Sequence, residues 1–168
     1  DATTDPIVIT GTGTPGAEVE VNVGGETQTG TIKDDGTWEV TFPVVALPGD
    51  GNYDTTVRVV DPDGTTHDLD GPSVIIDTTP PDLDVTSGTQ STGDIVNGSE
   101  HSSGTVITGT GEAGASVSVV INGHTQTTTV GTDGSWSVTF DSGQINTGEY
   151  TTGVSITTTD DFGNSANY

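Results

Sequence analysis

The sequence predicts an all-β protein made of two tandem antiparallel sandwich domains. Three observations predict this fold: the sequence repeats internally, apolar and polar residues alternate within each copy, and no stretch has helical periodicity. Residues 9–42 align without a gap on residues 107–140, at an offset of 98 residues. Of these 34 positions, 20 are identical, so the two copies are expected to share one fold.

The second copy shows its strands most clearly. Val117, Val119 and Ile121 alternate with other residues, and Asn122-Gly123 is typical of a two-residue hairpin turn. A repeat of about 100 residues with this pattern is the size of an immunoglobulin-like β-sandwich with Greek-key connections. The strands expected in this copy are Leu83–Ser87, 105–109, Ser116–Ile121, 125–130, Ser135–Phe140 and 150–158.

The first copy repeats the pattern in a different phase. Its expected strands are Glu18–Val23, 27–32, 38–42 and 53–60. The first copy lacks a counterpart of residues 82–98, and the second lacks a counterpart of residues 65–76. The first domain is therefore expected to lack its first strand and the second its last. Either the chain is cut from a longer protein, or neighbouring segments complete the open edges.

The two domains are expected to meet at a short linker rich in proline and aspartate. We place the first domain at residues 1–77, the linker at 78–81 and the second domain at 82–168. Pro80 and Pro81 fix φ and hold the backbone extended, which makes the linker stiff. Asp77, Asp82 and Asp84 bring three carboxylates close together. Because such charges repel, a bound cation is the natural candidate to neutralise them.

Composition limits the partners. The formal net charge is −23, and the chain has two Lys and Arg residues in all. Nucleic acids and anionic membranes need a basic face, so both are excluded as expected partners. Low apolar content is also found in disordered chains, but the ordered alternation favours a folded protein. There are no cysteines, so a metal is expected to stabilise the small domains in place of disulfides.

Strand parity gathers acidic residues at one end of the second domain. Successive antiparallel strands run up and down, so the turns at 112, 133 and 160 return to the end at which the linker enters. Many carboxylate and carbonyl oxygens suit calcium, whereas zinc would favour Cys or His. We expect a calcium site at this joint made of Asp77, Asp82, Asp84, Glu112, Asp160, Asp161 and Asn164. Further candidates, each of which could instead be a turn residue bonded to its own backbone, are Asp35, Asp61, Asp63 and Asp133.

Several motifs together resemble a known family. They are Thr-Gly-Thr-Gly-x-x-Gly-Ala-x-Val-x-Val, Asp-Gly-Thr/Ser-Trp-x-Val-Thr-Phe, Gly-x-Tyr-Thr-Thr and Asp-x-x-Gly-Asn. The combination resembles the bacterial immunoglobulin-like repeats of giant surface and biofilm adhesins secreted by type I systems. The resemblance implies an extracellular rod on the bacterial surface, with calcium at the domain junctions, neighbouring repeats as partners and a distal binding region held away from the cell. The first copy departs from the last motif, with Asp61-Pro62-Asp63-Gly64 in its place.

Three classes of function differ in what they require of the sequence. A non-catalytic extender needs only stiff tandem domains, whereas a calcium-dependent binding module needs a recognition loop for a glycan or protein, and residues 43–52 form the longest loop of the first copy. An enzyme is not expected, because the acids lie in turns and no nucleophile motif is present. Trp38 and Trp136 are expected in the cores, and Tyr53 and Tyr150 in tyrosine corners. The sequence therefore favours the extender.

Overall fold

The computed structural model describes residues 6–43, 46–88 and 95–168, which form antiparallel strands and one short α-helix. This confirms the predicted all-β fold. The chain divides into two compact units, Asp1–Thr78 and Thr79–Tyr168. The division falls within the residues predicted as a linker, and the linker as a separate segment stays a prediction. Among the described residues, no helix is long and apolar enough to span a bilayer.

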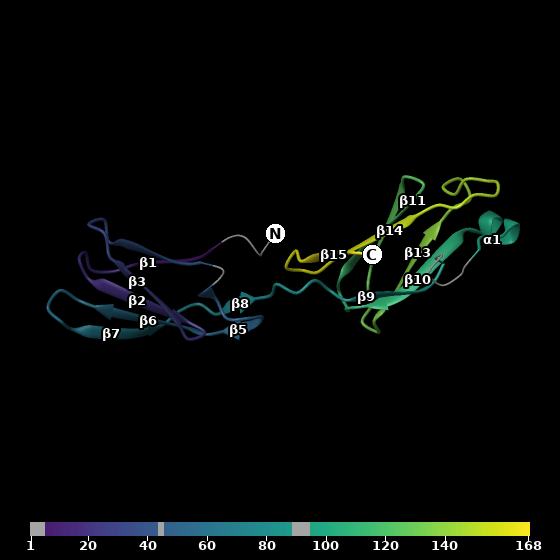
Figure 1. Ribbon diagram of the computed structural model, residues 1–168. Helices are drawn as coiled ribbons and strands as arrows, with labels where there is room; N and C mark the ends of the chain where they lie inside the picture. Colours follow the sequence, from purple (N-terminus) through teal and green to yellow (C-terminus); the bar gives the residue numbers. More distant parts are fainter. Residues whose placement is uncertain (1–5, 44–45, 89–94) are drawn as a thin grey trace. The chain divides into compact units, whose positions relative to one another are not determined.

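The first unit has two layers of antiparallel strands (Figure 1). One layer has the strand order β3-β2-β6-β7, and the β1-β4 and β5-β8 pairs make the rest. The β1-β4 ladder runs from Ile7 opposite Phe42 to Thr12 opposite Thr37. The elements are β1 (Ile7–Thr12), β2 (Glu18–Val23), β3 (Glu26–Thr31), β4 (Thr37–Phe42), β5 (Gly51–Tyr53), β6 (Thr55–Val60), β7 (Thr66–Asp70) and β8 (Val74–Ile76).

The second unit repeats this plan with different edges. Its sheets have the strand orders β13-β10-β9 and β12-β11-β14-β15. A β-bulge between Thr108 and Gly109 shifts the register of the β9-β10 ladder. The elements are β9 (Leu83–Ser87), α1 (Gly98–Ser103), β10 (Thr105–Gly111), β11 (Ser116–Ile121), β12 (His124–Thr129), β13 (Ser135–Phe140), β14 (Val154–Thr159) and β15 (Ser165–Asn167).

Each unit has its own hydrophobic core, built by period-2 alternation. In β11, Val117 and Val119 are fully buried, and Ser118 between them lies half-buried. Their counterparts Val19 and Val21 are fully buried in the first unit. Trp38 and Trp136 are buried in the two cores, as predicted. Each core cluster is therefore made of residues of its own unit.

The hairpin turns follow the residues that their backbone conformations require. Asn122 has φ of 51° and Gly123 has φ of 79° between β11 and β12. A type I′ turn needs positive φ at both central residues, which explains Asn-Gly at this position. In the first unit, Gly24 and Gly25 take the same place with φ of 58° and 96°.

The tyrosine-corner prediction holds for one tyrosine only. The Tyr53 hydroxyl donates to the Gly49 carbonyl, four residues upstream, at 2.8 Å. The Tyr150 hydroxyl instead accepts a hydrogen bond from Asn122 Nδ2 at 3.0 Å. The two tyrosines stand at different places, because Thr55 and Val154 lie opposite the equivalent residues Val23 and Ile121, which puts Tyr150 at the place of Gly51.

The short helix α1 was not predicted from the sequence, which has no helical periodicity there. Asn97 caps this six-residue helix by accepting hydrogen bonds from the Ser99 and Glu100 backbone N–H groups. The Glu100 side chain accepts a bond from the Asn97 backbone, which completes a capping box. The helix buries none of its residues. It therefore has no apolar face, and its sequence shows no hydrophobic periodicity that would predict a helix.

In the part of the chain that the structure describes, the two units differ at the edges of their sheets. β9 pairs with β10 in the second unit, and β8 pairs with β5 in the first. Within the described residues, the first unit has no strand at the place of β9, and the second has none at the place of β8. In the loop 43–52, which was considered as a contact surface, residues 44–45 lie outside the described part.

Candidate metal centre

The β9-β10 ladder brings two of the predicted ligands side by side. Leu83 lies opposite Gly111, so the next residues outward are Asp82 and Glu112. The Glu112 backbone N–H donates to the Asp82 carbonyl at 3.2 Å, and both side chains are exposed. Asp84 lies opposite Thr110 and is also exposed. These carboxylates therefore lie at one end of the second unit, open to solvent.

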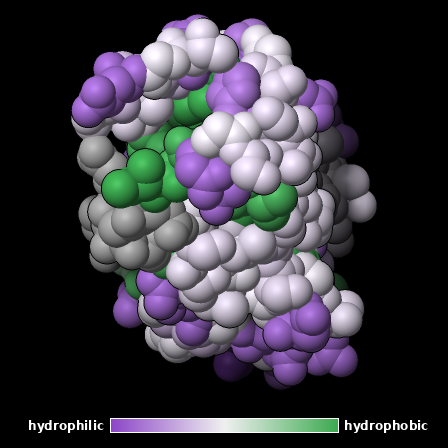
Figure 2. Space-filling model, turned by 90° about the vertical axis from the view of Figure 1, so that its right-hand side faces the viewer, coloured by the Kyte–Doolittle hydropathy of each residue, from purple (hydrophilic) through white to green (hydrophobic). Residues whose placement is uncertain are grey.

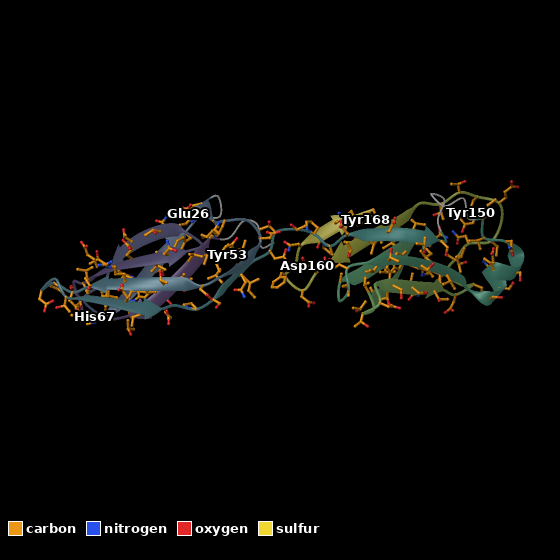
Figure 3. All side chains as sticks on the ribbon, turned by 90° about the horizontal axis from the view of Figure 1, so that it is seen from below. Glu26, Tyr53, His67, Tyr150, Asp160 and Tyr168 are labelled. Atoms are coloured by element: carbon orange, nitrogen blue, oxygen red, sulfur yellow. The ribbon has the colours of Figure 1, made fainter. Side chains whose placement is uncertain are left out.

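The turn at residues 160–164 lies at the same end of the β-sheet. Thr159, the last residue of β14, lies opposite Ser116, which follows the turn that begins at Glu112. The Gly111 N–H donates to the Gly134 carbonyl at 2.9 Å, which places the turn beside Asp133 there as well. Figure 3 shows Asp160 at the opposite end of this unit from Tyr150. The convergence that strand parity predicted is therefore present in the backbone.

Asp160 organises its own turn. Its Oδ1 accepts hydrogen bonds from the backbone N–H groups of Phe162 and Asn164, each at 2.8 Å. Its Oδ2 accepts a bond from Asn164 Nδ2 at 2.8 Å, and Asn164 is buried. Asp161, the next residue, is exposed. Asp160 and Asn164 are thus bonded to each other, and Asp161 is exposed to solvent.

These contacts decide the charge of Asp160. Partial burial raises its pKa, but the hydrogen bonds from Asn164 and from the turn's backbone N–H groups outweigh burial and lower the pKa below its usual value of 3.8. The side chain is therefore a carboxylate at neutral pH. Because the folded-state pKa is depressed, its stabilising contribution is complete above the unfolded-state pKa and is lost as pH falls through the folded-state pKa.

Replacing Asn164 by alanine should raise the pKa of Asp160, because it removes the amide donor to Oδ2 and leaves the backbone donors in place. The carboxyl titration of Asp160 measured by NMR tests this prediction. Asp133, whose partners are in Ser135, serves as the internal control and should titrate unchanged. A titration of Asp160 that is the same in both proteins would contradict this assignment of the pKa shift.

Most of the other candidate acids are bonded in their own turns. The Asp35 and Asp133 carboxylates each accept bonds from a backbone N–H and a hydroxyl two residues on, at 2.7–3.0 Å. Asp63 accepts the Thr65 N–H at 2.9 Å. These bonds lower the pKa of all three carboxyls. Asp61 Oδ2 lies 2.9 Å from His67 Nε2. Asp35, Asp63 and Asp133 therefore have the turn contacts that the sequence left open, whereas Asp61 contacts His67.

The end of the first unit holds an acid that sequence reasoning missed. Asp50 Oδ1 accepts bonds from the Thr78 backbone N–H at 2.8 Å and from its hydroxyl at 2.7 Å. Gly51 lies opposite Ile76, so Asp50 and the half-buried Asp77 are the next residues along this pair of strands. β5 and β8 have three residues each, too few for alternation to reveal the pairing.

The described residues contain no group of three or more His, Cys, Asp or Glu side chains placed to hold a metal ion. The donors nevertheless suit calcium in kind, because every candidate offers oxygen and Asp82, Asp84, Glu112 and Asp161 are exposed. The set of ligands predicted from the sequence stays a prediction.

Comparison with known proteins identifies the domain family. Residues 87–168 match the sequence model of a family described as bacterial Ig domain. The second unit is a bacterial Ig domain. The first unit carries its repeat, and its β3-β2-β6-β7 sheet has the same strand order as the β12-β11-β14-β15 sheet of the second unit. A comparison with curated proteins gave no match.

Two solved structures of bacterial adhesins are similar to this tandem. One is a Ca²⁺-stabilized adhesin that helps an Antarctic bacterium reach out and bind ice; it has a TM-score of 0.52 and 28% identity, over 99% of this chain and 43% of that one. The other is a 1.5-MDa bacterial ice-binding adhesin, with a TM-score of 0.50 and 23% identity, over 99% of this chain and 56% of that one. This chain thus spans less than two thirds of either structure, and the second likeness shows the fold alone.

These findings confirm the resemblance to tandem bacterial Ig-like repeats of large adhesins. They also confirm the extracellular, cell-surface location predicted from the sequence. Bacterial Ig domains and the adhesin repeats matched here are structural and adhesion modules.

Proposed function

We propose that this tandem is a non-catalytic extender of a bacterial surface adhesin, rigidified by calcium and holding a distal binding region away from the cell. The observation that carries the proposal is that two repeats of one bacterial Ig fold follow each other directly, each with its own core. Such an arrangement suits a spacer, because each domain adds length without adding a new surface chemistry. The neighbouring repeats of the same chain are the proposed partners.

The calcium part of the proposal rests on acidity and on the position of the acids. The chain has a formal net charge of −23. Asp82 and Glu112 lie side by side at the end of the second unit that follows the linker, and the turn of Asp160 and Asp161 returns to that end. The Ca²⁺-stabilized adhesin supports calcium over other cations. Asp77, Asp84 and Asn164 complete the proposed set.

The proposed role of the ion is electrostatic. A bound calcium ion supplies two positive charges and takes six to eight oxygen ligands. The β9-β10 pairing would hold the Asp82 and Glu112 carboxylates at the end of the second unit that follows the linker. The hydrogen bond between Asp160 and Asn164 would fix the 160–164 turn. Pro80 and Pro81 limit the backbone conformations of the linker. The bound ion would in addition neutralise the carboxylates beside the linker and so reduce their mutual repulsion.

Solution scattering tests the extender directly. In millimolar calcium the wild-type chain should give a narrower distribution of lengths than in excess chelator. The double variant Asp82→Asn, Glu112→Gln should lose most of this calcium response, because it removes two proposed ligand charges. The control Asp141→Asn, Glu149→Gln removes the same charge from exposed positions after β13 and should respond as wild type. An equal response of both variants would overturn the assigned ligands, and no response in wild type would overturn the calcium-rigidified extender.

A further inference from the structure

β12 is an edge strand of the second unit. Its sheet has the order β12-β11-β14-β15, so among the described strands β12 pairs with β11 alone. Its counterpart β3 also lies at the edge of its sheet, in the order β3-β2-β6-β7, so this open edge belongs to the fold of both units. An edge strand offers unpaired backbone N–H and C=O groups to another strand, and proteins protect such edges with charges, proline or a bulge.

The hairpin between β11 and β12 fixes which backbone groups of β12 face outward. Ile121 lies opposite His124 across the two-residue turn, and the residues that close such a turn bond to each other. Bonded and non-bonded pairs alternate along an antiparallel ladder, so every second residue from His124 bonds to β11. Thr125, Thr127 and Thr129 therefore direct their N–H and C=O groups away from β11. All three residues are exposed.

β12 lacks the usual protection of an edge strand. Its sequence contains no Asp, Glu, Lys, Arg or Pro, and its register with β11 is continuous. On β11, Ser116 and Ser118 lie opposite Thr129 and Thr127, so the neighbouring strand adds hydroxyl groups and no charge. Figure 2 shows that residues of intermediate hydropathy, a class that includes Thr and Ser, cover much of one face of the molecule. A second copy can thus approach β12 without meeting a carboxylate of β11 or β12, although the chain has a formal net charge of −23.

The first unit protects the same edge with acids. Glu18 and Glu20 of β2 lie beside β3, at the places that Ser116 and Ser118 take beside β12. Glu26, the first residue of β3, adds a third carboxylate, and all three side chains are exposed. Two β3 strands brought edge to edge would gather these acids from both copies, and like charges oppose strand pairing. The two units therefore have the same edge in their backbones and opposite suitability for pairing in their side chains.

We propose that β12 is a contact strand for a second copy of this chain, and that the two β12 strands pair antiparallel about a two-fold axis. Thr127 lies opposite its own counterpart, and Thr125 lies opposite the counterpart of Thr129. In this register the outward N–H and C=O groups of all three threonines bond across the axis, and their side chains form the Thr–Thr pairs that favour antiparallel sheets. One uncharged strand supplies both sides, because a two-fold contact is self-complementary.

Sedimentation velocity of the full chain tests the contact. High ionic strength is needed, because it screens the repulsion between two copies of net charge −23. The mass should rise toward that of a dimer as the protein concentration approaches about 1 mM, the range of a weak contact. Strand pairing needs no metal, so the dimer should form equally in chelator and in calcium. Failure of this proposal is therefore distinguishable from failure of the calcium-rigidified extender.

A proline variant tests which edge is used. Thr127→Pro removes an N–H that does not bond to β11, so an edge strand tolerates it, but the bond across the axis is lost. The dissociation constant of the dimer should rise at least about tenfold. Thr29→Pro is the matched change in β3 and should leave the dimer unchanged. Hydrogen exchange supplies an independent measurement, because the amides of Thr125, Thr127 and Thr129 should become protected only at the concentrations at which the dimer forms.

Cysteine variants test the register, because the chain has no cysteine of its own. Residues of a bonded antiparallel pair have Cα atoms about 5.5 Å apart, within the range of a disulfide. With oxidised glutathione, Thr127→Cys should therefore cross-link at least about tenfold faster than Thr125→Cys, which lies opposite a different residue, or Thr29→Cys in β3. A chain that stays monomeric, equal dimers with Thr127→Pro and Thr29→Pro, or equal cross-linking of the three cysteine variants overturns the proposal.

Discussion

Millimolar calcium should raise the melting temperature of the chelated protein by more than about 10 °C. At a free ion concentration one hundred times the Kd, one bound ion stabilises the folded state by about 2.7 kcal/mol. For a domain of 60–100 residues, each kcal/mol raises the melting temperature by about 4–8 °C. Differential scanning calorimetry of one sample in excess chelator and in calcium measures the shift.

Ionic strength is the necessary control for that melt. A chain with a formal net charge of −23 repels itself, and any salt screens part of this repulsion. Sodium chloride at matched ionic strength should give only a small shift. Magnesium should also give less than calcium, because it demands stricter octahedral geometry and keeps its waters. If all three salts shift the melting temperature equally, charge screening explains the shift and the proposal of a specific calcium site is contradicted.

The fold was predictable because its signals are local and periodic. Alternation in β2, β4, β11 and β13 marks their buried faces directly, and the turn residues mark where each strand ends. The internal repeat shows the same pattern in both copies, so each of these strands is predicted from two stretches of sequence. The helix α1 escaped because its capping box is a local polar signal and it has no buried face.

The candidate site was predictable only at the level of the backbone. Parity placed Glu112 and the 160–164 turn at one end of the second unit, and the strand registers agree. Strand parity predicts the position of a residue but not its side-chain contacts. Asp82 is exposed to solvent, whereas the Asp160 carboxylate accepts hydrogen bonds from the backbone of its own turn. Asp50 could not be found, because its role depends on the β5-β8 pairing of two very short strands.

Replacing Phe140 by alanine should destabilise the second unit by about 3–5 kcal/mol and leave the first unit nearly unchanged. Phe140 is fully buried in the core cluster of the second unit, and its counterpart Phe42 is fully buried in that of the first. Phe42→Ala is the matched variant and should reverse the pattern. A loss of this size is a large fraction of the 5–15 kcal/mol that stabilises a typical domain, so the affected unit should melt far earlier.

Each unit carries its own fluorescent reporter for this experiment. Trp38 lies in the first core and Trp136 in the second, so Trp38→Phe and Trp136→Phe backgrounds each leave one tryptophan to follow. With Phe140→Ala, the Trp136 signal should unfold at lower denaturant while the Trp38 signal keeps its midpoint. Simultaneous loss of both signals would mean that the units unfold as one cooperative body. Repeating the pair of titrations in calcium separates the alternatives further, because an ion that couples the repeats should pass part of the Phe140→Ala destabilisation to the Trp38 signal.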